Sequence, residues 1–307
     1  MRTRHALPLL AALVAAAAFG PRMAEAARVL RWTGPDGVRH YGDHVPQDTV
    51  TRDVESLPVH GEPSAIAGLR TRPVAGGYQA LADNRLAGPV EVRLRFVHAR
   101  NFRADPLLPA RVVVPARSSV VVATLSVVDP FAGADFELDM DAERGDPRAR
   151  PHDVEYILPL RGVPLRIEQG FGGSFSHADA QNRYAIDFTA PIGTPVLAAR
   201  DGVVMEVESD FARGGLDAER YGGRANMVRL LHEDGAMSVY AHLKPDGALV
   251  RLGQRVRAGD VIGLSGNTGF TSGPHLHFSV QVNRGMRLES IPFRMRGPQG
   301  PLRLRGN

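Results

Sequence analysis

The sequence of 307 residues contains no cysteine and a single lysine, Lys244. The absence of cysteine excludes disulfides, zinc–thiolate sites, iron–sulfur clusters and thiol nucleophiles. Aromatic residues are scarce at 6%, and the arginines are scattered rather than clustered, so the chain lacks the footprint of a nucleic-acid-binding protein. We therefore expect no nucleic-acid partner, and any chemistry that needs a lysine has one candidate position.

Long apolar runs are also missing, with one exception near the N-terminus. The run Ala6–Phe19 has 14 residues, fewer than the roughly 17–25 that span a bilayer. Arg2 and Arg4 precede it, and Ala24-Glu25-Ala26 follows as a small-x-small cleavage site. This order is typical of a cleaved secretory signal over residues 1–26 rather than of a membrane anchor, so we expect an exported protein with no membrane span after cleavage.

What remains is an ordinary globular composition, with 43% hydrophobic and 23% charged residues. This supplies enough apolar material for one sizeable core or two smaller ones. The formal net charge is +4, and cleavage after Ala26 would lower it to +2. Charge therefore indicates no more than a modest attraction to an anionic envelope polymer.

Turn residues and strand patterns divide the chain into parts that are mainly β. Strands expected at Val29–Trp32 and Val38–Tyr41 flank the turn Gly34-Pro35-Asp36-Gly37, and this region resembles a small N-terminal domain of bacterial envelope proteins. Alternating segments such as Val90–Phe96 predict a small β-sandwich-like module. The expected division is a signal at 1–26, the N-terminal domain at 28–55, a linker at 56–87, the β module at 88–141, a linker at 142–160, a glycine-punctuated domain of short antiparallel strands at 161–293, and a tail at 294–307.

Histidines at strand spacing provide candidate chemistry in the last domain. In the segment His275-Leu276-His277-Phe278 the two histidines share one face of a strand, whereas Leu276 and Phe278 point into the core. Two imidazoles placed in this way suit a metal, or one ligand and one general base. An HxH pattern alone is weak evidence for either.

Two other segments carry a polar residue within an apolar run. In YAIDF, Asp187 must be paired or bound to a metal, because burying a lone carboxylate is costly. In YAHL, a strand would place Tyr240 and His242 on one face, and a structural core histidine is the alternative to a catalytic one. Without cysteine, a zinc site must use imidazole and carboxylate, and two histidines with one aspartate leave a position open, as in catalytic zinc sites. The helical HExxH motif is absent.

Four blocks of residues 161–293 resemble, in their order, the lysostaphin-type (LytM-domain) zinc endopeptidases that cut peptidoglycan peptides. The blocks are the segment that ends in YAIDF, PIGTPVLAARDGVV, NMVRLLHEDGAMSVYAHL, and the highly specific LGQRVRAGDVIGLSGNTGFTSGPHLHF. The resemblance implies an antiparallel β-sheet groove of the LytM/lysostaphin type. It also implies one Zn²⁺ held by His177, Asp187 and His277, with His242 and His275 as unligated catalytic histidines.

The first block departs from the pattern of the family. Three residues usually separate its histidine from its aspartate, whereas nine separate His177 from Asp187. His152 and Asp179 therefore stay open as alternative ligands. The extra residues most simply form a loop at the edge of the groove.

The implied function is a secreted zinc endopeptidase that hydrolyses peptide bonds in peptidoglycan stem peptides or cross-links. We expect a periplasmic location, with an extracellular one as the alternative, and a D-alanyl–diaminopimelate bond, with a glycyl bridge as the alternative. One of His242 and His275, for which we favour His275, would take the proton of the attacking water, and the other would stabilise the oxyanion or protonate the amine. The candidate substrate contacts are Asn226, Tyr184 and Phe270.

Two other functions compete with this one. Some members of the family have lost their zinc ligands and regulate other cell-wall hydrolases, but the full set of five residues argues against an inactive regulator or binder here. GTPVLAARDGVVMEVE and GQRVRAGDVIG resemble the half-motifs of biotinyl and lipoyl carrier domains, yet Lys244 lies outside both. From their position alone, the N-terminal parts could also cover the groove.

Overall fold

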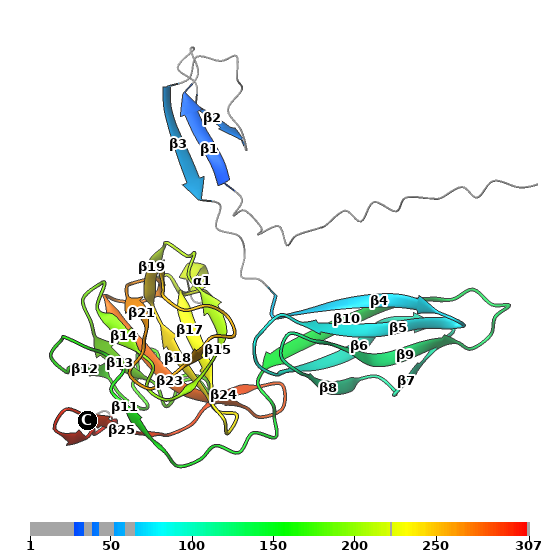
Figure 1. The fold of residues 1–307 in the computed structure, drawn as a ribbon. Coiled ribbons are helices and arrows are strands. Elements are labelled where there is room, and N and C mark those ends of the chain that lie inside the picture. Colours follow the sequence, from blue (N-terminus) through cyan, green and yellow to red (C-terminus); the bar gives the residue numbers. More distant parts are fainter. Residues whose placement is uncertain (1–27, 34–38, 43–51, 59–64, 222, 306–307) are drawn as a thin grey trace, which may run out of the picture. The chain divides into compact units, whose positions relative to one another are not determined.

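The computed structural model describes residues 28–33, 39–42, 52–58, 65–221 and 223–305 (Figure 1). The predicted signal at 1–26 lies outside these residues. Contacts divide the chain into two units, residues 1–61 and residues 62–307. In the described part of the chain, no helix is both long and apolar enough to cross a membrane.

A three-stranded antiparallel sheet makes up the described part of the first unit. The predicted hairpin is confirmed, because β1 (Arg28–Thr33) pairs with β2 (Arg39–Gly42), with Trp32 opposite His40. Its turn at 34–37 lies outside the described residues. A third strand, β3 (Arg52–Pro58), pairs with the other edge of β1 and runs into the start of the predicted linker at 56–87.

The second unit begins with a β-sandwich in which two antiparallel sheets pack face to face (Figure 1). The alternation predicted for Val90–Phe96 is confirmed at Val90, Val92 and Leu94, which are fully buried in its core. One sheet has the order β4-β5-β9-β7 and the other β10-β6-β8. The strands are β4 (Ala67–Val74), β5 (Gly77–Asn84), β6 (Val90–Arg100), β7 (Phe102–Asp105), β8 (Ala110–Val114), β9 (Ser119–Val127) and β10 (Asp135–Arg144).

The predicted linker at 56–87 is therefore wrong over most of its length, because β4 and β5 form a hairpin there. Its glycines serve the hairpin rather than a flexible connection. Gly76 adopts a φ of +78° in the turn, a conformation that favours glycine. Gly77 lies so close to β9 that a Cβ atom would stand 1.8 Å from the carbonyl oxygen of Leu125.

The predicted linker at 142–160 and the predicted tail at 294–307 also contain strands. β10 continues to Arg144, and β11 (Glu155–Ile157) pairs in parallel with β25 (Arg294–Gly297), which in turn pairs with β26 (Gly300–Pro301). Tyr156 and Met295 on these strands are buried in the core of the C-terminal domain. These short segments show no clear periodicity in sequence, because packing against the rest of the domain determines their structure.

The C-terminal domain is built on an eight-stranded antiparallel sheet, with the order β12-β13-β23-β18-β17-β15-β20 and β24 beside β23. A smaller sheet, β14-β21-β19, packs against it, and β16 pairs with β22 next to the short helix α1. The bounds are β12 (Ile167–Gln169), β13 (Ile186–Thr189), β14 (Pro195–Leu197), β15 (Gly202–Glu208), β16 (Gly214–Gly215), α1 (Ala218–Tyr221), β17 (Met227–Leu231), β18 (Met237–Ala241), β19 (Leu243–Ala248), β20 (Arg255–Val256), β21 (Val261–Ser265), β22 (Gly269–Phe270), β23 (His275–Asn283) and β24 (Leu288–Ser290).

The two faces of the large sheet have different roles. Fully buried side chains such as Phe188, Tyr240 and Phe278 point from one face toward Val196 and Ile262 of the smaller sheet and form the core. Because neighbouring residues of a strand point to opposite faces, the residues between them point to the other face. That other face forms the floor of the cleft described below.

The sandwich and the C-terminal domain share part of their packing. Met205, Met237 and Leu288 of the C-terminal domain belong to the same buried cluster as the sandwich core. At the end of β10, Arg144 donates two hydrogen bonds to Glu206 on β15, of 2.6 and 2.5 Å. The Glu206 side chain is only 5% exposed and also accepts a bond from Arg229.

Replacing Arg144 with alanine should destabilise this junction, because Glu206 would stay buried with half of its charge pairing lost. We expect the free energy of unfolding to fall by about 3 kcal/mol, the lower end of the range for a broken buried ion pair, since Arg229 remains. Urea denaturation would measure the change. The matched control is Arg148→Ala, whose ion pair with Asp146 is formed by an arginine 80% exposed and should cost less than about 0.5 kcal/mol. Equal losses in the two variants would contradict the expected role.

Candidate metal centre and cleft

A row of side chains crosses the large sheet and forms the floor of an open cleft of about 480 Å³. Strand pairing places Asp187 opposite His277, His277 opposite Ala241, Ala241 opposite Met227, and Met227 opposite Glu208. All five residues line the cleft. The alternation predicted for His275–Phe278 is thus confirmed in β23, and β13 alternates in the same way, since the residues on either side of Asp187 and His277 are in the core.

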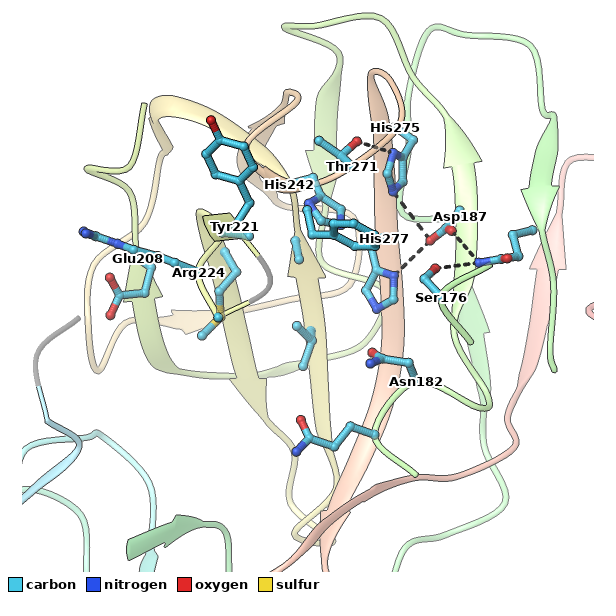
Figure 2. A pocket seen from close by; sticks show the side chains of 18 of the residues that line it. Ser176, Asn182, Asp187, Glu208, Tyr221, Arg224, His242, Thr271, His275 and His277 are labelled. Atoms are coloured by element: carbon cyan, nitrogen blue, oxygen red, sulfur yellow. Dashed lines mark hydrogen bonds and ion pairs between the residues drawn. The ribbon is translucent and has the colours of Figure 1, made fainter. Parts of the chain in front are cut away.

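Three of the predicted metal ligands come together at one end of this row. Figure 2 shows two of them, Asp187 and His277. One potential ligand atom from each of His177, Asp187 and His277 lies within 4.8 Å of the others. His177 comes from the loop between β12 and β13 and is fully buried. The alternatives are elsewhere: His152 lines a separate hollow, and the Asp179 carboxylate accepts hydrogen bonds from the backbone of its own loop.

The hydrogen bonds of His177 determine which ring nitrogen faces the site. Nδ1 lies 2.9 Å from the carbonyl oxygen of Gly170, and because a carbonyl can only accept, Nδ1 carries the proton. Nε2 is left with its lone pair, fully buried and with no hydrogen-bond partner among the described residues. It stands 3.3 Å from a carboxylate oxygen of Asp187. Two acceptors that face each other at this distance repel unless a proton or a metal cation is shared between them, and the donor set fits a metal ion.

The charge of Asp187 is also set by its neighbours. Burial alone would raise the pKa of its carboxyl group, but the proximity of His177 and His277 outweighs burial and holds the pKa far below its usual value. Nδ1 of His277 lies 2.9 Å from one carboxylate oxygen. Asp187 is therefore ionised throughout the physiological range, as a metal ligand must be.

His242 and His275 form a second pair beside the three ligands, with ring centroids 4.6 Å apart. Each ring has Nδ1 against a backbone carbonyl, Thr268 at 2.6 Å for His242 and Gly273 at 2.8 Å for His275. Both Nδ1 atoms are therefore donors, and both Nε2 atoms are acceptors when the rings are neutral. Burial, followed by the nearby His275 and His277, lowers the pKa of His242 to about 3.

The prediction that Tyr240 and His242 share a face is wrong. Tyr240 is fully buried on the core side, where its hydroxyl accepts a hydrogen bond from the backbone of Ala199. His242 follows the end of β18 with a φ of +62°, a left-handed conformation that is rare outside glycine. This turn of the backbone directs the His242 side chain into the cleft, and such strain is often found at functional sites.

No pattern in the sequence indicated the residues that hold this cluster in place. Gln169 donates hydrogen bonds to a carboxylate oxygen of Asp187 at 3.1 Å and to Ser176 at 2.7 Å. A Cβ atom on Gly173 would stand 2.1 Å from the Gln169 side chain, so glycine is needed there. The Thr271 hydroxyl lies 3.3 Å from Nδ1 of His275.

Replacing Gln169 with alanine should weaken metal binding without removing a ligand. The Asp187 carboxylate would lose the donor that orients it, and the loss of such a supporting contact typically lowers metal affinity 10–100-fold. Competition with a zinc chelator would measure the dissociation constant. Gln181→Ala is the matched control, because the Gln181 side chain lines the same cleft but makes no side-chain hydrogen bond to a described residue. An unchanged constant in the Gln169 variant would refute this role.

Of the three candidate substrate contacts, the structure brings only Phe270 to the cleft, where it stacks on Phe175 with centroids 5.7 Å apart. Tyr184 packs against Phe171 and is not among the residues that line the cleft. Asn226 is fully buried, and its amide bonds the backbone of Phe211 and of the segment after His242. Its observed contacts are structural.

Comparison with known proteins gives matches to the C-terminal domain. Residues 181–288 match the model of peptidase family M23. The match includes Asp187, His242, His275 and His277 but begins after His177, so the position of His177 as a ligand depends on the geometry described above.

Three similar proteins illustrate the range of relatives. The DD-carboxypeptidase/endopeptidase Mpg of Neisseria gonorrhoeae is 41% identical over 98 residues, 32% of this chain and 20% of its own length. The glycyl-glycine endopeptidase ALE-1 of Staphylococcus capitis is 36% identical over 115 residues, 37% of this chain and 28% of its own length. The catalytic domain of the antimicrobial peptidase lysostaphin from Staphylococcus simulans is 34% identical, over 39% of this chain and 81% of that one, with a TM-score of 0.31. The chain thus covers only 20% and 28% of the length of the two curated relatives, Mpg and ALE-1.

Proposed function

We infer the function of this protein from the premise that its C-terminal domain belongs to peptidase family M23. We propose that the protein is a zinc-dependent endopeptidase that hydrolyses peptide bonds in peptidoglycan. The observation that carries the proposal is the buried group of His177, Asp187 and His277 at the end of an open cleft. There a ring nitrogen with no hydrogen-bond partner among the described residues faces a carboxylate.

The chemistry of the ligands favours zinc as the ion. Two imidazoles and one carboxylate are a common donor set of catalytic zinc sites, which keep a further position open for water or substrate. When bound, zinc would lower the pKa of a coordinated water to about 7 and polarise the scissile carbonyl group. His177, Asp187 and His277 would hold the ion, and Gln169 would orient Asp187.

The two other histidines would move and orient protons. His275 presents an acceptor nitrogen to the cleft and takes the proton of the attacking water, then returns it to the leaving amine. His242 resists protonation, because burial and its neighbours lower its pKa to about 3. With Nδ1 donating to the carbonyl oxygen of Thr268, a neutral His242 has no second N–H to donate to an oxyanion, so we assign it to orienting the water by accepting a hydrogen bond at Nε2.

The substrate and location follow from the family and the predicted signal. The relatives include a DD-carboxypeptidase/endopeptidase and a glycyl-glycine endopeptidase, so both kinds of bond occur in the family. We propose the D-alanyl–diaminopimelate cross-link of periplasmic murein as the substrate, with a glycyl bridge as the alternative.

The alternative of an inactive regulator is disfavoured because all five residues with proposed roles are present and gathered in one site. The idea that the N-terminal parts cover the groove gains no support. Among residues 65–221 and 223–305, Arg144 is the one residue of the sandwich that lines the cleft.

Zinc quantification together with digestion of purified sacculi tests the proposal. The mature chain should contain about one zinc ion and release muropeptides from cross-linked murein, and the product masses identify the bond. A chelator should stop the release, and added zinc should restore it. A chain without bound zinc that releases nothing from either type of cell wall would instead support the regulator.

A further inference from the structure

The end of the cleft floor opposite the metal ligands carries a carboxylate without a partner. Glu208 is the last residue of β15 and lines the cleft (Figure 2). Its side chain forms no hydrogen bond or ion pair with any residue in the described part of the chain. The neighbouring charges are paired: Arg144 and Arg229 bind Glu206, and Arg224 binds Asp210 at 2.7 Å.

Such a carboxylate is costly for the protein in its present surroundings. Glu208 is half-buried, and burial, followed by the negative charges of Glu206 and Asp210, raises the pKa of its carboxyl group, an effect that the positive charges of Arg224 and Arg144 only partly offset. Natural proteins generally pair a buried charge with an opposite one. A ligand cation next to Glu208 would supply that pairing, whereas a ligand carboxylate at the same position would meet repulsion from Glu208.

We propose that Glu208 binds a protonated primary amine of the peptide substrate and so selects peptides that carry one. The inference rests on the proposed endopeptidase function. It names a specificity-determining contact at a distance from the scissile bond, in the part of the cleft also lined by Tyr221 and Arg224.

The spacing of the sheet sets the distance of this amine from the reacting bond. Three strand-to-strand steps separate His277 from Glu208 along the row, and at about 4.8 Å a step this is roughly 14 Å. An extended peptide covers that distance in about four residues, or in fewer when the amine ends a long side chain. The floor between the two ends is Ala241 and Met227, an apolar surface suited to the methylene groups of such a chain.

The test compares two versions of one cleavable muropeptide, one with a free side-chain amine and one with that amine acetylated. The wild-type enzyme should show kcat/KM at least about tenfold higher for the free amine, because a charge-assisted hydrogen bond is lost on acetylation. In Glu208→Gln, which keeps the shape but not the charge, this ratio should fall to near one. Glu219→Gln is the matched control, an exposed carboxylate on α1 that does not line the cleft, and should keep the wild-type ratio.

Equilibrium binding of both peptides separates this proposal from the proposed function. Cleavage of neither peptide by the wild type would overturn the endopeptidase proposal, while a binding preference for the free amine that Glu208→Gln abolishes would still support the subsite. An equal binding affinity of the wild type for the two peptides, or the same preference in Glu208→Gln, would overturn the subsite whether or not the peptides are cleaved. Loss of the preference in Glu219→Gln would also overturn the subsite, because the preference would then depend on the net charge of the protein rather than on Glu208.

Discussion

Replacing His177 with alanine is expected to reduce bound zinc from about one ion per chain to near zero and to abolish peptidoglycan hydrolysis. His177 supplies one of three ligand atoms that lie within 4.8 Å of one another, and its Nε2 has no other described partner. Two remaining ligands form a poor site for a zinc ion, which takes four in its usual geometry. Metal analysis after dialysis, together with release from sacculi, measures both effects.

The matched control for this prediction is His152→Ala. His152 is the alternative ligand that the long spacing before Asp187 left open, and it lines a hollow separate from the cleft. This variant should keep both its zinc and its activity. Retention of zinc in His177→Ala together with its loss in His152→Ala would show that the ion is held elsewhere than the geometry indicates.

Local periodicity explains how much of the site could be predicted. An alternation of two residues is enough to place Asp187 and His277 on a common face of their strands, opposite the core side chains Ile186 and Phe278. It does not determine strand order, so it could not show that Asp187 and His277 would be directly opposed. The supporting role of Gln169 depends on that pairing and has no local pattern.

His242 illustrates where periodicity fails. Continued as an extended strand, its segment would point the histidine to the core beside Tyr240. A single residue with φ of +62° reverses that direction, and nothing in the four residues YAHL indicates it. The two glycines around the start of β5 misled the prediction in the opposite sense. They suggested a linker, whereas Gly76 forms a tight turn and Gly77 allows close approach to Leu125.

Replacing either His242 or His275 with alanine is expected to lower kcat by about 10²–10⁴-fold while zinc stays bound, because each ring acts on protons rather than on the ion. The observed contacts carry this distinction. Each Nδ1 donates a hydrogen bond to a backbone carbonyl oxygen, and the His242 ring centroid lies 5.8 Å from that of His277. These variants should therefore lose kcat while they keep their zinc, whereas His177→Ala should lose both. Loss of zinc in His242→Ala would contradict the role assigned to it.

The double variant His242→Ala/His275→Ala tests whether the two rings serve one step. If His242 orients the water whose proton His275 accepts, removing both should cost about as much as removing His275 alone, because residues that act as a unit are not additive. His98→Ala is the control, since His98 is 52% exposed on the sandwich and should leave kcat within about twofold. If the loss of kcat in the double variant instead equals the product of the two single losses, the histidines act in separate steps. His242 would then assist the departure of the amine rather than the attack of water.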